Sequence, residues 1–180
     1  MSAEPTRPFQ NAREVLKTHV ARIVEGIAGQ PEKTAVTYRV SGGPPGKRLL
    51  TTLRVSAAGV AIHEHSDEMD GKRSMHSRTT LSENEVKSLF RQVEDSGLLE
   101  QVDTGKGFLP DSVIGSIIIE SPDARVAYHF LAEEHQQKSQ QKEPTPPVQR
   151  LKATLENLSE KVRKQSVGKK ASQKNKKQRR

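Results

Sequence analysis

LSENEVKSLFRQVEDSGLL, residues 81–99, carries the clearest local signal in the chain. Ser82 can accept a hydrogen bond from the amide of Glu85 while the Glu85 carboxylate accepts one from the Ser82 amide, which is the reciprocal pattern of a capping box. The apolar residues that follow recur at helical spacing; they are Val86, Leu89, Phe90 and Val93. Gly97 ends the pattern, because glycine readily adopts the left-handed conformation after a helix. We therefore predict an amphipathic helix over residues 83–96 that packs across a sheet.

Strand-like segments stand on both sides of this helix. Alternating apolar and polar residues predict half-buried strands, and a short apolar run predicts a strand covered on both faces. The segments are TAVTYRV (34–40), RLLTTLRV (48–55), GVAIHEH (59–65), SVIGSIIIE (112–120) and RVAYHFLAE (125–133). SVIGSIIIE is predicted to be a central strand, and RVAYHFLAE to pair with it after the SPDA turn. The predicted fold is α+β, with four or five antiparallel strands packed against one helix.

Helices are expected to flank this body at both ends. Asn11 and Glu14 have capping-box spacing and open a predicted helix over about residues 12–28. The chain is therefore divided into an N-terminal helix, a sheet-and-helix domain, a linker, an amphipathic helix and a disordered basic tail. Their bounds are 1–32, 33–135, 136–147, 148–164 and 165–180. The linker is assigned because its Gln, Lys and Pro residues interrupt the periodic pattern.

Five apolar residues of the predicted helix at 148–164 repeat at intervals of three and four. They are Val148, Leu151, Leu155, Leu158 and Val162. The spacing makes one seam, but it covers only about two heptads, fewer than a self-sufficient coiled coil needs. The helix is predicted either to dock on the body or to bind a partner protein. Leu151, Leu155 and Leu158 are the candidate contacts with that partner.

The net positive charge comes from the C-terminal end. The chain has 30 Lys and Arg against 22 Asp and Glu, and residues 161–180 hold ten of the basic residues and no acid. Residues 1–160 therefore hold 20 basic and 22 acidic residues, so the body is slightly acidic. Contacts between cationic side chains and phosphates release counterions and give an affinity that falls with salt. We predict that residues 161–180 bind nucleic acid or another polyanion.

The candidate polyanion-binding residues are all the cations of this segment. They are Lys161, Arg163, Lys164, Lys169, Lys170, Lys174, Lys176, Lys177, Arg179 and Arg180. The segment has no aromatic residue that could stack on bases, so we expect binding without sequence specificity. KKASQKNKKQRR (169–180) would also suit a nuclear-localisation signal if the organism has a nucleus.

Several classes of protein are excluded by what the sequence lacks. The chain has no Cys, which excludes disulfides, thiolate nucleophiles and Cys-ligated zinc. The N-terminus lacks the features of a secretory signal, and no apolar run approaches the ~20 residues that span a bilayer. We therefore expect a soluble, cytoplasmic protein with no membrane partner.

HEHSDEMD (63–70) is the stretch that most resembles a chemical site. His63 and His65 are two residues apart, so on a strand both project to one face and could share a metal ion. Asp67 or Asp70 could supply a third ligand. A metal-dependent enzyme built on the two histidines is the resulting hypothesis.

The alternation of the same strand favours a different interpretation. Val60 and Ile62 are expected to take the buried face, which turns the two histidines toward solvent. A metal site on that outer face would need His76 or His129 to approach from another strand. We therefore predict no metal and no cofactor, with the stretch forming a polar strand face and an acidic turn.

Two glycine-rich segments have the composition of binding loops. GGPPGK (42–47) departs from the phosphate-binding pattern at two positions, and its prolines remove amides that would hold phosphate, so it is predicted to be a turn. GKGFLPD (105–111) is more simply a helix-to-strand connection, although Phe108 and Leu109 stay candidate contacts with a partner protein. No nucleophile-elbow, HExxH or EF-hand spacing occurs, and we predict a non-enzymatic protein.

The order of strand, GG turn, strands, capped helix, loop and two strands resembles the emfourin-like proteins. The residues that carry this resemblance are TYRVSGG (37–43), LSENEVKSLFRQVEDSGLL (81–99) and DSVIGSIIIESPDARVAYHF (111–130). The resemblance covers residues 35–135 and implies a single sheet-and-helix layer. It also implies a possible activity, inhibition of thermolysin-like metalloproteases, although no inhibitory residue can be assigned in this chain.

The favoured function is a non-enzymatic binding or adaptor protein. Its folded body would contact a protein partner, and its basic segment would contact nucleic acid or another polyanion. The alternative is a proteinaceous inhibitor of thermolysin-like metalloproteases.

Overall fold

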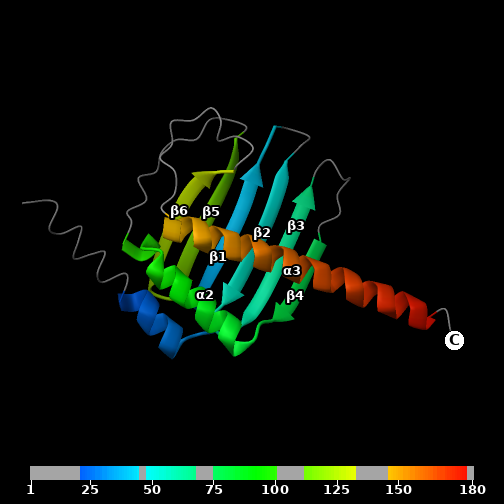
Figure 1. The fold of residues 1–180 in the computed structure, drawn as a ribbon, viewed down its shortest axis with the longest axis horizontal. Coiled ribbons are helices and arrows are strands. Elements are labelled where there is room, and N and C mark those ends of the chain that lie inside the picture. The colour runs from blue at the N-terminus through cyan, green and yellow to red at the C-terminus, as the bar shows by residue number, and fades with distance from the viewer. Residues whose placement is uncertain (1–20, 45–47, 68–74, 101–111, 133–145, 178–180) are drawn as a thin grey trace, which may run out of the picture.

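The structure, a computed structural model, describes residues 21–44, 48–67, 75–100, 112–132 and 146–177 (Figure 1). Six antiparallel strands form one sheet in the order β4-β3-β2-β1-β5-β6. The strands are β1 (Ala35–Gly42), β2 (Leu49–Ser56), β3 (Val60–Asp67), β4 (Met75–Thr80), β5 (Val113–Ser121) and β6 (Ala124–Leu131). The predicted α+β class with an antiparallel sheet is confirmed.

The sheet has one strand more than the four or five that were predicted. The additional strand is β4, whose sequence MHSRTT has one apolar residue, Met75, and no alternation that would signal a strand. It lies at the edge of the sheet and pairs with β3 from Val60↔Thr80 to His65↔Met75. The backbone ladder with β3 therefore forms this strand, and such long-range pairing is not encoded in its local pattern.

The capped helix is present as predicted. α2 (Glu83–Asp95) has Ser82 as N-cap, and both hydrogen bonds of the capping box are formed. The Ser82 amide donates to Glu85 Oε2 at 2.9 Å, and the Glu85 amide donates to Ser82 Oγ at 3.4 Å. Leu89, Phe90 and Val93 are its buried residues. A short 3-10 helix, η1 (Leu98–Glu100), follows and adds two buried leucines to the core.

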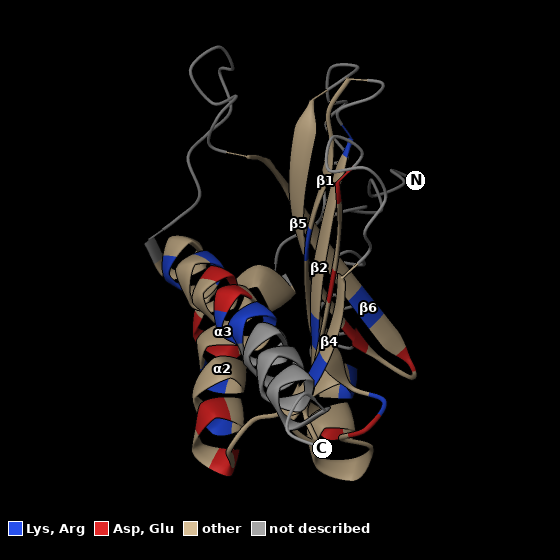
Figure 2. Ribbon diagram, turned by 90° about the vertical axis from the view of Figure 1, so that its right-hand side faces the viewer, with Lys and Arg blue, Asp and Glu red and all other residues tan. Residues whose placement is uncertain are grey.

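The C-terminal helix is an integral part of the fold. α3 (Pro146–Lys177) crosses the same side of the sheet as α2, and it contacts β1, β2, β3, β4 and α2 (Figures 1 and 2). Near its start, Lys152 Nζ lies 5.2 Å from the centre of the Phe130 ring on β6. One turn later, Tyr38 Oη on β1 donates to Glu156 Oε1 at 2.9 Å. The helix thus traverses the sheet from the β6 side toward β4.

Polar contacts also join α3 to α2. Thr154 Oγ1 donates to Gln92 Oε1 at 2.8 Å, and the ammonium of Lys161 pairs with the Glu85 carboxylate. The partnership with Lys161, together with the capping hydrogen bonds, lowers the pKa of Glu85 to about 2. Glu85, the capping-box partner of Ser82, therefore also pairs with a residue in the middle of α3.

One apolar core lies between the sheet and the helices. Alternate residues of the central strands face it, in agreement with the period of two along a strand; they include Val36, Tyr38, Leu53, Val55, Ile117 and Ile119. The helices contribute Leu89, Phe90, Val93, Val148, Leu151, Leu155 and Val162. Residues 21–29 form the described part of the N-terminal helix, and Ile23 from this part is fully buried in the same core. The described parts of the segments assigned separately at 1–32, 33–135 and 148–164 thus share one core.

Candidate functional site

Basic residues continue along residues 165–177, the second half of α3. Residues 165–177 continue the helix, so the prediction of a disordered tail over 165–180 is wrong for these thirteen positions. Two physical effects favour the helix here. Extending a helix that is already packed costs less than nucleating one, and cations near a helix C-terminus interact favourably with its dipole. Arg179 and Arg180 lie outside the described residues.

Seen against the sheet, this second half of α3 leads away from the body. In Figure 1 the helix runs past β4 and continues beyond the edge of the sheet. At a rise of 1.5 Å per residue, the thirteen residues 165–177 extend for roughly 20 Å. Residues 165–180 contain seven Lys or Arg and no acid. The chain therefore joins a helix that is anchored at one end to a cationic end that carries no carboxylate side chain.

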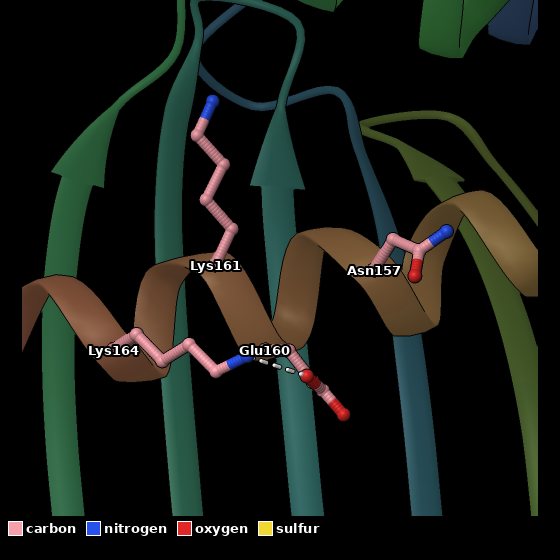
Figure 3. Close-up of a pocket in the computed structure, with 4 residues that line it drawn as sticks. All are labelled: Asn157, Glu160, Lys161 and Lys164. Carbon is pink, nitrogen blue, oxygen red and sulfur yellow. Dashed lines mark hydrogen bonds and ion pairs between the residues drawn. The ribbon is translucent and has the colours of Figure 1, made fainter.

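The first three cations of the segment have identified surroundings. Lys164 Nζ pairs with Glu160 Oε2 at 3.0 Å, whereas Lys161 points away from that pair and reaches Glu85 (Figure 3). A shallow pocket of about 540 Å³ lies beside these side chains, and it is lined by Asn157, Glu160, Lys161 and Lys164. Arg163 lines a different cleft, beneath the helix. Lys161 and Lys164 are thus each paired with a carboxylate, whereas residues 165–180 hold seven cations and no acid.

The prediction that His63 and His65 of β3 face solvent is wrong. Ala61 and His63 are buried on the side covered by α3, whereas Val60 and Ile62 are only partly buried on the opposite side. His63 pairs in register with Leu53 of β2, which in turn pairs with Tyr38 of β1, so that the histidine continues a buried row. The partly apolar outer face, which also carries Arg54 beside Ile62, accommodates the aliphatic residues.

A cleft of about 360 Å³ lies between α3 and this part of the sheet. Its lining includes Tyr38, Thr51, His63, His65, Glu156 and Arg163. His65 Nδ1 is 2.9 Å from Thr51 Oγ1, and the two imidazole rings stack with centroids 6.5 Å apart. His63 Nδ1 and Ser77 Oγ, which belong to residues paired in register, are both buried and find no hydrogen-bond partner among the described residues.

Burial is the main influence on the charge of His63. It lowers the pKa of this imidazole below its ordinary value, and the positive charges of His65 and Arg163 act in the same direction. The carboxylate of Glu64 opposes them with a smaller effect. His63 is therefore neutral at physiological pH in the folded chain.

In the part of the chain that the structure describes, no third residue joins His63 and His65 as a metal ligand. Within those residues, no group of three or more His, Asp or Glu is placed to hold a metal ion. His76 instead lies 3.4 Å from Glu64 on the outer face. His129 pairs in register with Ser116 on the same outer face, but β6 and β4 are the two opposite edges of the sheet. Asp70 lies outside the described residues.

The leucines predicted to contact a partner protein are in the core instead. Leu151 and Leu155 are 0% exposed, and Leu158 is partly buried against the same cluster. The apolar seam of α3 is therefore used by docking on the sheet, which was the other predicted outcome. Phe108 and Leu109, the remaining candidates, lie outside the described residues.

No family model matches the chain, and no curated protein matches it significantly. The resemblance to emfourin-like proteins therefore stays a prediction. None of the described helices is long and apolar enough to cross a membrane.

Proposed function

We propose that this protein is a non-enzymatic binding protein that holds nucleic acid through the basic second half of α3. The observation that carries the proposal is that one helix joins a part docked on the sheet to a part that is rich in cations and free of acids. The first half of α3 contributes Leu151 and Leu155 to the core, and residues 165–180 hold seven cations and no acid. A dense run of cations without acids attracts phosphates through counterion release.

Anchoring the helix supports this function. The buried side chains of Leu155 and Val162, and the pair between Lys161 and Glu85, fix the helix just before the basic residues begin. A cationic segment that continues a fixed helix loses less conformational freedom on binding than a free chain does, and that loss is part of the cost of association. The folded body would thus hold the nucleic-acid-binding helix in a fixed position.

The chemistry of the helix favours contacts with phosphates over readout of bases. Residues 146–180 contain no Phe, Tyr or Trp that could stack on a base. Contacts with phosphates position a protein on nucleic acid but carry no sequence information. The proposal is therefore binding with little sequence preference and a strong dependence on salt.

Contact of the body with a protein partner is the second part of the proposal. Docking of α3 covers Leu151 and Leu155, so they can meet a partner only if α3 leaves the sheet. Phe108 and Leu109 are therefore the first residues to substitute in a search for such a contact.

Removing residues 165–180 will weaken binding to a 20-base-pair DNA duplex by about 100-fold or more at low salt. The cut is placed after residue 164 so that Val162, which is 1% exposed, stays in the core. Fluorescence anisotropy should be recorded for both chains with duplex DNA, single-stranded RNA and heparin, at two salt concentrations. Thermal unfolding of the shortened chain serves as the control for folding.

Two results would contradict the proposal. One is equal affinity of the full and shortened chains, which would place binding on the body. The other is a full chain that binds none of the three polyanions at low salt. Binding of heparin alone would restrict the ligand to another polyanion and would overturn the assignment to nucleic acid.

A further inference from the structure

An imidazole lies buried beneath α3 without a hydrogen-bond partner for its Nδ1 among the described residues. His63 is 1% exposed, and both its Nδ1 and the Oγ of the neighbouring Ser77 lack a hydrogen-bond partner among the described residues. A buried polar group that is left unsatisfied costs free energy, and a buried charge costs far more unless it is paired. The site therefore tolerates a neutral imidazole but penalises an imidazolium.

The groups that face His63 do not provide a counter-charge for it. On β3 itself, His65 lies beside it on the same face, and the carboxylate of Glu64 points to the other face toward His76. On β4 and β2 its register neighbours are the uncharged Ser77 and Leu53.

The charged groups of α3 complete the surroundings of His63. Arg163 lines the same cleft and disfavours the imidazolium. Glu156 and Glu160 line the cleft as well, but Glu156 accepts from Tyr38 and pairs with Lys152, and Glu160 pairs with Lys164. Neither carboxylate is among the groups that raise the pKa of His63.

The sign of the pH effect follows from this environment. The pKa of His63 is lowered from 6.5 in the folded chain, first by burial and then by His65 and Arg163. An unfolded or locally opened chain takes up the proton at the ordinary value. The stability that the folded chain gains by keeping His63 neutral is therefore complete above about pH 6.5. It is lost as the pH falls from there toward the lower pKa that His63 has in the folded chain.

Opening α3 is the least disruptive way to expose His63 to water. The backbone of β3 is held on both sides by ladders with β2 and β4. By contrast, the cover over the cleft comes from α3, through Ser159, Glu160 and Arg163. Leu151 and Leu155 keep the earlier turns of the helix docked, so release of the later turns has to break only the packing of Val162 and the pair between Lys161 and Glu85.

We propose that the docking of α3 on the sheet is sensitive to pH. Protonation of His63 at mildly acidic pH releases the turns of α3 around residues 156–164 from β3 and β4. Release uncovers the cleft and frees the base of the cationic helix from the body. The proposal concerns the fold and does not depend on nucleic-acid binding.

Hydrogen exchange at about pH 7.5 and about pH 5.5 tests the release, after correction for the intrinsic effect of pH on exchange. The amides of residues 156–164 are expected to exchange at least about tenfold faster at the lower pH, while those of β1 and β5 stay protected. The His63→Leu variant places an apolar side chain of similar size beneath α3. It should show no acceleration of exchange at the lower pH. The matched control is His129→Asn, an exposed histidine of the outer face, which should behave as the unchanged chain does.

A second variant keeps the test decisive if His63→Leu does not fold. Arg163 is exposed, and its change to Gln removes one of the positive charges that oppose the imidazolium, so the acid-induced acceleration should become smaller. Arg91→Gln on α2 is the matched control and should leave it unchanged. The proposal is overturned if residues 156–164 exchange equally at the two pH values. It is also overturned if His63→Leu retains the full acceleration, or if Arg163→Gln has no more effect than Arg91→Gln.

Discussion

Leu155→Ala will lower the free energy of unfolding by about 2–5 kcal/mol. Leu155 is 0% exposed and packs in the same cluster as Leu89 of α2 and Leu53 of β2. Truncation removes the burial of the side chain and leaves a cavity that the rigid sheet cannot fill completely. The size of the loss reports whether α3 belongs to the core of the domain.

Urea denaturation followed by circular dichroism measures this loss. Asn157→Ala, two residues further along α3, is the matched control, because Asn157 is exposed and its removal should change stability by less than about 0.5 kcal/mol. A loss below about 1 kcal/mol for Leu155→Ala would mean that α3 is not packed on the sheet as described. The proposed anchoring of the basic helix would then have no basis.

Gly115→Ala is the second change with a large expected effect, a loss of about 3 kcal/mol or more. A Cβ atom at residue 115 would lie 2.1 Å from Cε2 of the Phe130 ring. That ring is confined, because Tyr38 and Tyr128 stack beside it at 6.4 and 6.2 Å and Lys152 covers it. Glycine in the middle of β5 is therefore required for the close approach of Phe130 to the strand.

Thermal and urea unfolding of three variants test this contact. Gly29→Ala is the control, since a Cβ atom there meets nothing within 4 Å among the described residues. Phe130→Leu shortens the group that clashes, so the loss caused by Gly115→Ala should be smaller in that background, by about 0.5–3 kcal/mol. Equal losses in both backgrounds would show that the ring is not the cause.

Local patterns in the sequence predict the parts of the fold that depend on neighbouring residues. The capping box of Ser82 and Glu85 and the buried face of α2 are confirmed, because both are set within one or two helical turns. The strand with Tyr38 and the apolar run around Ile117 also form strands of the sheet as expected, whereas their pairing with each other was not predicted.

The errors concern contacts between segments distant in the sequence. The alternation of β3 allows either face to be buried, and the decision depends on α3, which covers His63 although Ile62 is the more hydrophobic residue. β4 forms through pairing with β3 and has almost no apolar residue of its own. The helical course of residues 165–177 likewise continues a helix whose start is fixed by the sheet.

The candidate site was predictable in composition but not in arrangement. The ten cations of residues 161–180 are evident from the sequence. That Lys161 reaches Glu85, and that Arg163 lines the same cleft as His63, could not be predicted because both depend on how α3 crosses the sheet. The same geometry separates the cations that stabilise the fold from those that follow residue 164.

The salt dependence of duplex binding is the most direct test of nucleic-acid binding by the second half of α3. Two variants with five cations each changed to Gln should be compared. One changes Lys169, Lys170, Lys174, Lys176 and Lys177 of the helix, and the other changes the exposed Lys33, Arg39, Arg78, Arg91 and Arg125 of the body. We predict that the slope of log K against log salt becomes shallower by up to about 4.5 for the helix variant, from about 0.9 per lost phosphate contact, and stays nearly unchanged for the body variant. Equal slopes for the two variants, or a larger change in the body variant, would contradict the proposal.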